Sequence, residues 1–198
     1  VPIQGTIDMG LPHFLQRVID EAEFEEAAAI IFDIDTFGGR VDAATQMKDI
    51  ILDSKVVTVA FINKRAISAG ALISLSCDSI FMTAGASIGA ATAVDLQGEK
   101  ASEKVISYMR EEMASTAEAN NRSRDVACAM VDEELSISFI VNSQGDTLTS
   151  KDVEGFSEGK LITLSTNLAL LLGIADEELN NIDDILTHMN LVDVEKVE

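Results

Sequence analysis

The sequence predicts an α/β fold in which helices pack on a mainly parallel sheet. Two continuous apolar runs, at residues 28–34 and 56–62, are typical of strands that are buried on both faces of a parallel sheet. A segment with helical spacing of apolar or small residues follows each run, at 41–52 and after Ser68. Strands and helices that alternate in this way indicate parallel strands joined by right-handed crossovers.

The first half of the chain gives this pattern in order. Residues 1–7 form a short β-type segment, and residues 11–26 carry apolar side chains at helical spacing. The strand at 28–34 is expected to end in a turn at 35–40, which leads into the helix at 41–52.

The next strand leads to a serine that is a candidate nucleophile. The strand at 56–62 breaks at 63–65, and the chain restarts at Ser68 as a small-residue helix. A serine on a sharp turn between a strand and a helix can be an activated nucleophile, because the turn exposes Oγ and the helix N-terminus supplies a positive field. Small neighbours such as Ala69 and Gly70 let a substrate backbone approach. Serine is also a favoured N-cap residue, so this stretch alone leaves both roles open.

Shorter elements are expected in the second half, and residues 1–198 together are expected to form one domain. A chain of 198 residues can bury one good core, and it contains no internal repeat or convincing linker. The expected strands lie at 78–82, 139–141, 147–149, 161–164 and 191–197. The expected helices lie at 102–121, 125–131, 165–172 and 182–189.

Composition and charge exclude several classes of function. The net charge of −20 argues against nucleic-acid binding, which needs a basic face. No apolar run approaches the roughly 18–20 residues that span a bilayer. Neither the cysteines, Cys77 and Cys128, nor the histidines, His13 and His188, have metal-ligand spacing, so we expect no metal site. The two cysteines could form one disulfide or remain free thiols.

A serine nucleophile needs a general base. Histidine is the usual partner, yet neither His13 nor His188 lies in a segment expected at the active-site edge of the sheet. A lysine can serve if it is neutral, for which the free lysine pKa of about 10.4 must fall by several units. Lys104 lies in the first turn of a long helix, where the helix dipole disfavours a cation. The alternatives are a solvated Lys104, or Lys64 or Arg65 as the basic group.

Backbone amides near Ser68 could hold an oxyanion. Active sites of α/β folds gather at the carboxyl ends of the strands, where both Ser68 and the pair Gly38 and Gly39 are expected. Glycine amides have no Cβ in the way, and the amide of Ala69 directly follows the serine. A Gly-Gly pair after a strand can also be a tight turn with no catalytic role.

Four short motifs and a lysine at a helix start resemble a known family. The motifs are DTFGG at 35–39, AISAGA at 66–71, SIGAA at 87–91 and SEGKLITL at 157–164. Together they resemble the N-terminal protease domain of NfeD-type membrane-bound serine proteases, in the superfamily of Clp protease and signal peptide peptidase A. The resemblance covers nearly the whole chain and keeps the order of the motifs.

This resemblance implies a ClpP/crotonase-like fold of repeated ββα units and a serine endopeptidase with a Ser-Lys dyad and no metal or cofactor. By motif, Ser68 matches the nucleophile and Lys104 the general base. Gly38, Gly39 and Ala69 match the donors of the oxyanion hole. The dyad separates this chain from Clp protease, which relies on a Ser-His-Asp triad.

The resemblance also implies partners and a location. Family substrates are hydrophobic segments of membrane proteins, notably the C-terminal regions of stomatin-like partners. A homodimer or higher homo-oligomer is expected, associated with the cell membrane and with the protease domain on its extracytoplasmic side. The transmembrane helices and small C-terminal β-barrel domain of the family are absent from residues 1–198. Phe37 stands where the family commonly has proline.

Two other functions use the same residues. A non-catalytic scaffold could bind a stomatin-like partner in the same groove without turnover. A crotonase-type acyl-CoA enzyme could use Gly38 and Gly39 as its oxyanion hole, but the acidic composition and the lack of an evident site for the CoA phosphates disfavour it.

Overall fold

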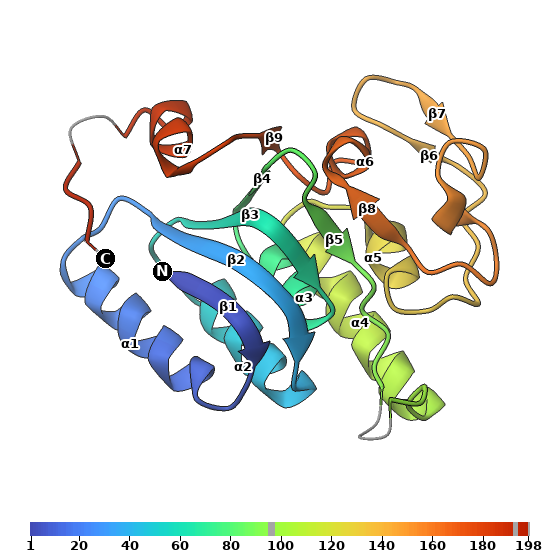
Figure 1. Ribbon diagram of the computed structural model, residues 1–198, viewed down its shortest axis with the longest axis horizontal. Helices are drawn as coiled ribbons and strands as arrows, with labels where there is room; N and C mark the ends of the chain where they lie inside the picture. The colour runs from blue at the N-terminus through green and yellow to red at the C-terminus, as the bar shows by residue number, and fades with distance from the viewer. Residues whose placement is uncertain (95–97, 192–193, 198) are drawn as a thin grey trace.

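A mostly parallel sheet with helices on both faces organises the chain (Figure 1). The computed structural model describes residues 1–94, 98–191 and 194–197. The strands are β1 (Pro2–Ile7), β2 (Ile30–Gly39), β3 (Thr58–Ile67), β4 (Ser79–Met82), β5 (Ser87–Gly89), β6 (Ile140–Val141), β7 (Thr147–Leu148), β8 (Thr163–Ser165) and β9 (Glu177–Glu178). The helices are α1 (Leu11–Phe24), α2 (Val41–Leu52), α3 (Ala69–Leu75), α4 (Glu103–Ala119), α5 (Arg124–Ala129), the 3-10 turn η1 (Glu154–Phe156), α6 (Thr166–Leu171) and α7 (Ile182–His188).

The main sheet divides along β3. Its neighbours follow the order β1-β2-β3-β4-β9, and all of these pairs are parallel. Residues 59–62 of β3 pair with β4, whereas residues 65–67 pair with β5. Strand β8 is antiparallel to β5 and continues this second branch. The last residues of β3 are therefore held by β2 on one side and by β5 on the other.

Both central strands are longer than the sequence suggests. The expected break at 63–65 is wrong, because β5, which lies in a segment expected only to turn, gives the end of β3 a new partner. The expected turn at 35–40 is also wrong, because β2 stays extended to Gly39 and pairs with β1 up to Ile7. The Gly-Gly pair thus ends a strand.

The helices and the small hairpin agree well with expectation. The helix at 41–52 has the predicted bounds, and helices occur within 11–26, 102–121 and 182–189. The two-stranded β6–β7 hairpin also forms. The closing strand expected at 191–197 is wrong for residues 191 and 194–197, which are irregular, and residues 192–193 lie outside the described part of the chain.

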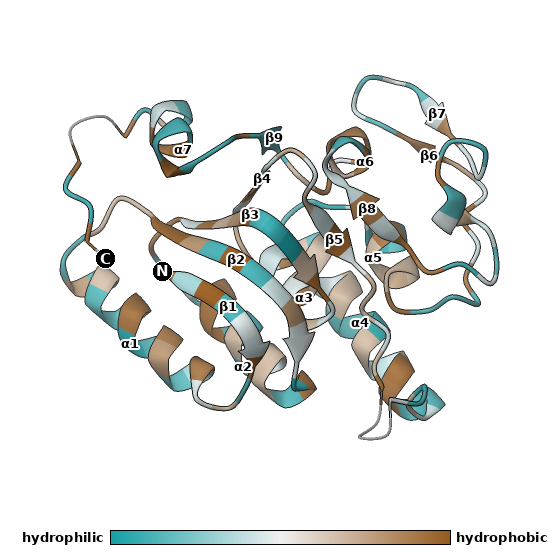
Figure 2. Ribbon diagram, in the orientation of Figure 1, coloured by the Kyte–Doolittle hydropathy of each residue, from teal (hydrophilic) through white to brown (hydrophobic). Residues whose placement is uncertain are grey.

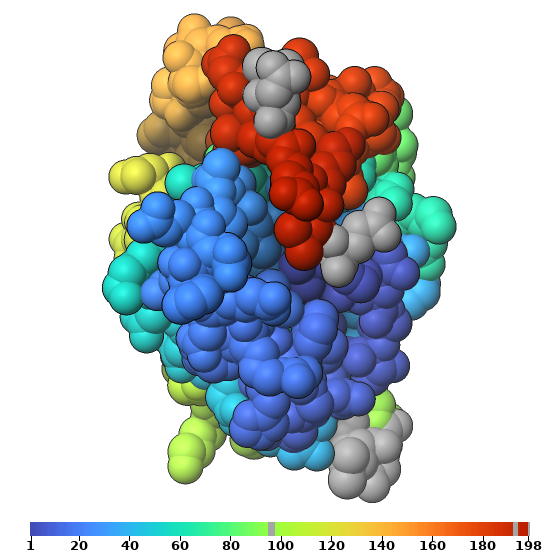
Figure 3. All heavy atoms as spheres, turned by 90° about the vertical axis from the view of Figure 1, so that its left-hand side faces the viewer, coloured from blue at the N-terminus to red at the C-terminus, as the bar shows by residue number. Residues whose placement is uncertain are grey.

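Hydrophobic packing covers both faces of the sheet. Helices α1, α2 and α3 contribute to the large core on one face, and every residue of α3 is buried. Hydrophobic and hydrophilic residues alternate in bands along α1, as in an amphipathic helix (Figure 2). On the other face, Phe61 and Phe81 pack against Ile185 of α7. Figure 3 shows the C-terminal residues, in red, lying against the blue N-terminal part. Within the described ranges, no helix has the length and hydrophobicity to cross a bilayer.

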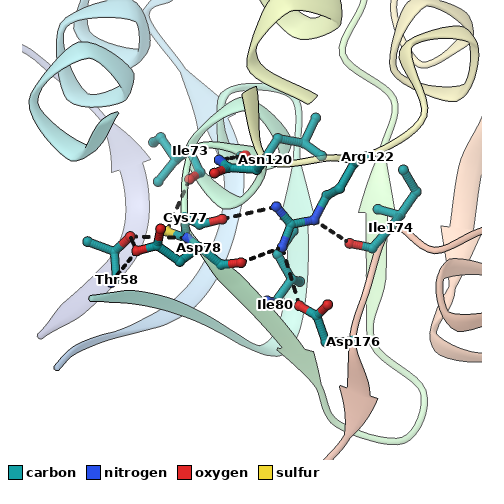
Figure 4. A network of polar contacts seen from close by, with 10 residues as sticks. Thr58, Ile73, Cys77, Asp78, Ile80, Asn120, Arg122, Ile174 and Asp176 are labelled. Carbon is teal, nitrogen blue, oxygen red and sulfur yellow. Dashed lines mark hydrogen bonds and ion pairs between the residues drawn. The ribbon is translucent and has the colours of Figure 1, made fainter. Parts of the chain in front are cut away.

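A buried arginine links its own segment to the segments that directly precede β4 and β9 (Figure 4). The guanidinium of Arg122 donates hydrogen bonds to the carbonyl oxygens of Cys77 and Asp78, at 3.0 and 3.2 Å. It also donates to the carbonyl oxygen of Ile174 at 3.0 Å and to the carboxylate of Asp176 at 3.3 Å. The side chain of Arg122 is only 4% exposed, and its bonds to the carbonyl oxygens of Cys77 and Ile174 are buried, so these two acceptors depend on the guanidinium.

Replacement of Arg122 by alanine should therefore destabilise the fold. We expect Arg122→Ala to lower the free energy of unfolding by about 3 kcal/mol, because it leaves buried carbonyl groups without donors. Urea unfolding measures the change. Arg124→Ala is the matched control, since its ion pairs with Glu111 and Glu118 are exposed and contribute little. Equal losses in the two variants would contradict the role of Arg122.

Candidate active site

Ser68 has a strained backbone between β3 and α3. Its φ and ψ angles are 56° and −116°, a region that non-glycine residues rarely adopt. Such a conformation costs on the order of 1–3 kcal/mol and persists only where its surroundings hold it. The amide of Ser68 donates to the carbonyl oxygen of Gly89, and its own carbonyl accepts from the amide of Ala71, both at 3.0 Å.

The strained backbone of Ser68 argues against a helix-capping role and favours the other role that the sequence leaves open, that of a nucleophile. An N-cap serine has a relaxed extended backbone and accepts a hydrogen bond from the helix. The side chain of Ser68 makes no such capping bond. A strained serine on a strand-to-helix turn is the geometry of a nucleophile elbow, which presents Oγ away from the backbone.

Gly38 lies directly against Ser68. A Cβ atom on Gly38 would lie 2.6 Å from Cβ and 3.1 Å from Oγ of Ser68, and the φ angle of Gly38 is +104°. Any side chain here would displace the serine. The structure thus brings these two predicted site residues together, although they are distant in sequence.

The amide of Gly38 is already engaged. It donates to Oγ1 of Thr36 at 2.9 Å, and this hydroxyl donates in turn to the carbonyl oxygen of Gly5 at 2.5 Å. Thr36 is buried and fixes the end of β2 from below. Sequence reasoning gave Thr36 no role, because its partners are set by the pairing of β1 with β2.

The amides of Gly39 and Ala69 are better placed as donors. In the β1–β2 pairing, the amide of Arg40 donates to the carbonyl oxygen of Ile7 at 2.9 Å. Consecutive amides of a regular strand point to opposite edges, and on this basis we assign the amide of Gly39 to the edge away from β1. Ala69 is the first residue of α3, and the first amides of a helix have no partner within it.

Close approach of α3 to β2 depends on a third glycine. A Cβ on Gly70 would lie 2.6 Å from Cγ2 of Thr36. Without it, the first turn of α3 sits against the end of β2 and carries Ser68 to Gly38. The small residues in the AISAGA motif therefore have a packing role beside any role in substrate access.

Lys104 is exposed in the first turn of α4. Two side-chain contacts link this helix to α2, which begins two residues after Gly39. Nζ of Lys48 lies 2.9 Å from Oε2 of Glu112, and the hydroxyl of Tyr108 lies 3.5 Å from that of Thr45. These contacts tie α4 to α2, but among the described residues no hydrogen bond or ion pair joins Lys104 to Ser68.

Other cations near the site are paired with carboxylates. Burial alone would lower the pKa of Lys48, but two neighbouring carboxylates, including that of Glu112, outweigh it and raise the pKa, which keeps this lysine charged. Lys64 and Arg65 both contact Asp35, at 3.6 and 3.0 Å. None of the three is suited to accept a proton from a serine.

Phe37 is exposed but has a specific partner. The guanidinium carbon of Arg65 lies 4.5 Å from the centre of the Phe37 ring, within the range of a cation–π contact. Because Arg65 also contacts Asp35, the strand end before Gly38 is held from its solvent side. This contact restrains the position where the resembling family has proline.

The histidines and cysteines take no part in this arrangement. Nδ1 of His188 lies 2.7 Å from a carboxylate oxygen of Glu177, and its ring packs edge-on against Phe81. His13 is exposed on α1. Cys77 and Cys128 are free, and burial raises the pKa of both thiols. Among the described residues, no group of three or more His, Cys, Asp or Glu side chains could hold a metal ion.

The strain at Ser68 predicts an unusual effect on stability. Ser68→Gly should be more stable than Ser68→Ala by about 1 kcal/mol, because glycine adopts a positive φ without steric cost. In a thermal melt this corresponds to a difference in Tm of about 2–4 °C. An alanine variant as stable as the glycine variant would show that the backbone of residue 68 is not strained.

Comparison with solved structures defines the class of fold. A serine-to-alanine mutant of 1510-N, a membrane-bound stomatin-specific protease, matches with a TM-score of 0.74 and 25% identity, over 94% of this chain and 81% of that one. A lysine-to-alanine mutant of 1510-N in complex with a substrate peptide also gives 0.74 and 25%, over 94% and 76% of the two chains. ClpP1 from Listeria monocytogenes matches in fold, with a TM-score of 0.64 and 23% identity over 92% of each chain. The fold is that of ClpP-like protease domains.

Sequence comparison then gives the family. The family model of the NfeD1b N-terminal domain matches residues 1–198, and the chain belongs to this family. The membrane protein NfeD1b of Bacillus subtilis (strain 168) is 41% identical over 170 residues, which are 84% of this chain and 39% of that protein. The membrane-bound protease PH1510 of Pyrococcus horikoshii is 30% identical over 143 residues, which are 68% and 32%. The chain thus spans well under half the length of these relatives. The predicted fold and family resemblance are confirmed.

Proposed function

We propose that this domain is a serine endopeptidase with a Ser-Lys dyad that cleaves hydrophobic segments of membrane-associated proteins, such as stomatin-like partners. The observation that carries the proposal is Ser68 itself. Its backbone is strained, its side chain makes no capping bond to the helix, and it lies against Gly38. The relatives support it, since PH1510 is named a membrane-bound protease and 1510-N a stomatin-specific one. The mutants of 1510-N replace one serine and one lysine, the two residue types of the dyad.

The reaction begins with proton transfer from the nucleophile. Neutral Nζ of Lys104 accepts the proton of Ser68 Oγ as Oγ attacks the carbonyl carbon of the scissile peptide bond. The carbonyl oxygen becomes an oxyanion, which the amides of Gly39 and Ala69 stabilise. As the intermediate collapses, Lys104 returns the proton to the leaving amine. Water then hydrolyses the ester on Ser68 by the same path.

Substrate binding would complete the site around the lysine. Lys104 is exposed in the free domain. A hydrophobic peptide that lies over the end of β2 would exclude water from the amine, and burial favours the neutral form of a lysine. Catalytic hydrogen bonds often tighten only when the substrate is bound. Hydrophobic substrates would therefore be favoured partly because they exclude water from the amine of Lys104.

The proposal also includes a location and an oligomeric state. One relative is named a membrane protein and the other a membrane-bound protease, which supports a place for this domain at the cell membrane. The extracytoplasmic side is our proposal from the family resemblance, with attachment through segments outside residues 1–198. We further propose that the domain forms a homodimer or a higher homo-oligomer. No metal or cofactor is needed for any step.

Substitution of either dyad residue should abolish cleavage. We expect Ser68→Ala and Lys104→Ala each to lower kcat by about a thousand-fold or more on a fluorogenic peptide with a hydrophobic centre. Lys64→Ala is the matched control and should keep its activity, because Lys64 is paired with Asp35 and is not the base. Retained cleavage in Ser68→Ala would overturn the proposal.

The scaffold alternative makes the opposite prediction for the unmodified domain. A scaffold would bind the C-terminal segment of a stomatin-like protein with no Ser68-dependent cleavage on prolonged incubation, as followed by mass spectrometry. An endopeptidase would release two fragments that are absent from the Ser68→Ala reaction.

A further inference from the structure

A buried threonine lies among the strand ends around the candidate site. Thr36 is only 1% exposed and belongs to the end of β2, two residues before Gly38. The register of β1 against β2 shifts here, and the pairing passes over Gly5 and Thr36. An irregularity of this kind re-aims the side chains around it, and it is common next to active sites.

The hydroxyl of Thr36 lies beside both polar backbone groups of Gly38. Its Oγ1 accepts a hydrogen bond from the amide of Gly38 at 2.9 Å and lies 3.5 Å from the carbonyl oxygen of the same residue. A hydroxyl has one proton, and the shorter distance of 2.5 Å assigns it to the carbonyl oxygen of Gly5. Strand β1 therefore fixes this hydroxyl, which in turn fixes Gly38.

The peptide bond between Gly38 and Gly39 carries the oxyanion donor of the proposed site. This peptide is trans, so its carbonyl and its amide point in opposite directions. Because the carbonyl oxygen of Gly38 lies near the hydroxyl of Thr36, the amide of Gly39 points away from Thr36. Glycine on both sides of the bond offers little steric resistance to rotation, so this orientation depends on hydrogen bonds.

The methyl group of Thr36 contacts the other half of the site. A Cβ on Gly70 would lie 2.6 Å from Cγ2 of Thr36, so this methyl group packs against the first turn of α3. Gly70 lies two residues after Ser68. One buried side chain thus touches the glycine strand with its hydroxyl and the helix after the serine with its methyl group.

We infer that Thr36 is a positioning residue, whose hydroxyl orients the peptide between Gly38 and Gly39 so that the amide of Gly39 faces the oxyanion. The inference rests on the proposed function and adds a residue to it. Thr36 acts through the backbone of Gly38. Loss of its hydroxyl therefore weakens binding of the transition state more than binding of the substrate, so kcat falls while KM changes little.

Two substitutions separate the hydroxyl from the methyl group. Thr36→Val keeps the shape but removes the hydroxyl, and it should lower kcat on the fluorogenic peptide by about 100-fold, as loss of an oxyanion donor does, with KM within about three-fold. Thr36→Ser keeps the hydroxyl and should recover kcat to within about ten-fold of the unmodified domain. Thr166→Val is the matched control and should leave kcat unchanged, since Thr166 is also buried and donates to a carbonyl oxygen, that of Thr83.

Hydrogen exchange at Gly38 gives a readout that does not depend on catalysis. Phe37-Gly38 is the only Phe-Gly pair in the sequence, so isotopic labelling of the phenylalanine carbonyl carbon and the glycine nitrogen selects this amide in an NMR spectrum. It should exchange at least about ten-fold faster in Thr36→Val and at an unchanged rate in Thr36→Ser. Thermal melts confirm that each variant is folded. If Thr36→Val does not fold, Thr36→Cys replaces it, because a thiol is a weak acceptor.

The outcomes separate this inference from the proposed function. Unchanged kcat in Thr36→Val, or equal losses in Thr36→Val and Thr36→Ser, would overturn the inference while Ser68-dependent cleavage stands. Unchanged exchange at Gly38 in Thr36→Val would overturn it as well. Slower turnover and faster exchange that only Thr36→Val shows support it. If the unmodified domain shows no Ser68-dependent cleavage, the proposed function fails instead, and exchange at Gly38 alone decides whether Thr36 holds this peptide.

Discussion

The contact between Gly38 and Ser68 is the constraint on which the rest of the site depends. Neither residue could hold its place alone, since one has a positive φ that only glycine tolerates well and the other has a positive φ that serine tolerates poorly. Thr36 fixes the first from below, and Gly89 and Ala71 hold the backbone of the second. The strain at the serine is thus offset by ordinary strand and helix hydrogen bonds around it, so the position of Ser68 is set by the fold itself.

The sequence was informative where structure is decided locally. A strand before Ser68 and a helix after it could be predicted because β-branched residues precede the serine and small residues follow it, although the break expected at 63–65 does not occur. The bounds of α2 could be predicted because apolar and small residues recur at helical spacing over residues 41–52. The sequence indicated that the amides of Gly38 and Gly39 could bind an oxyanion, but it could not show which of the two amides is already hydrogen-bonded within the fold. That distinction needs the hydroxyl of Thr36 and the register of β1, which are properties of the folded sheet.

Distant contacts explain what the sequence did not predict. The polar residues at 63–65 resemble a turn, but β3 continues through them to Ile67, where Arg65, Ala66 and Ile67 pair with β5. Likewise, nothing local shows that Phe37 meets Arg65, or that Tyr108 faces Thr45 and so brings α4 to α2. The helix that carries Lys104 could be predicted, but its neighbours could not, because side-chain contacts between helices far apart in sequence depend on the whole fold.

Strand β3 changes its pairing partner from β4 to β5 along its length, so its two ends lie in different parts of the structure. Its first half, with Phe61, lies under α7 and belongs to the packing that keeps the domain folded. Its last residues pair with β5 and end at the serine. A substitution at Phe61 would therefore disturb the packing against α7, whereas a substitution at residues 65–67 would disturb the strand end that leads to Ser68. The two halves of β3 thus contribute separately, one to the core and the other to the candidate site.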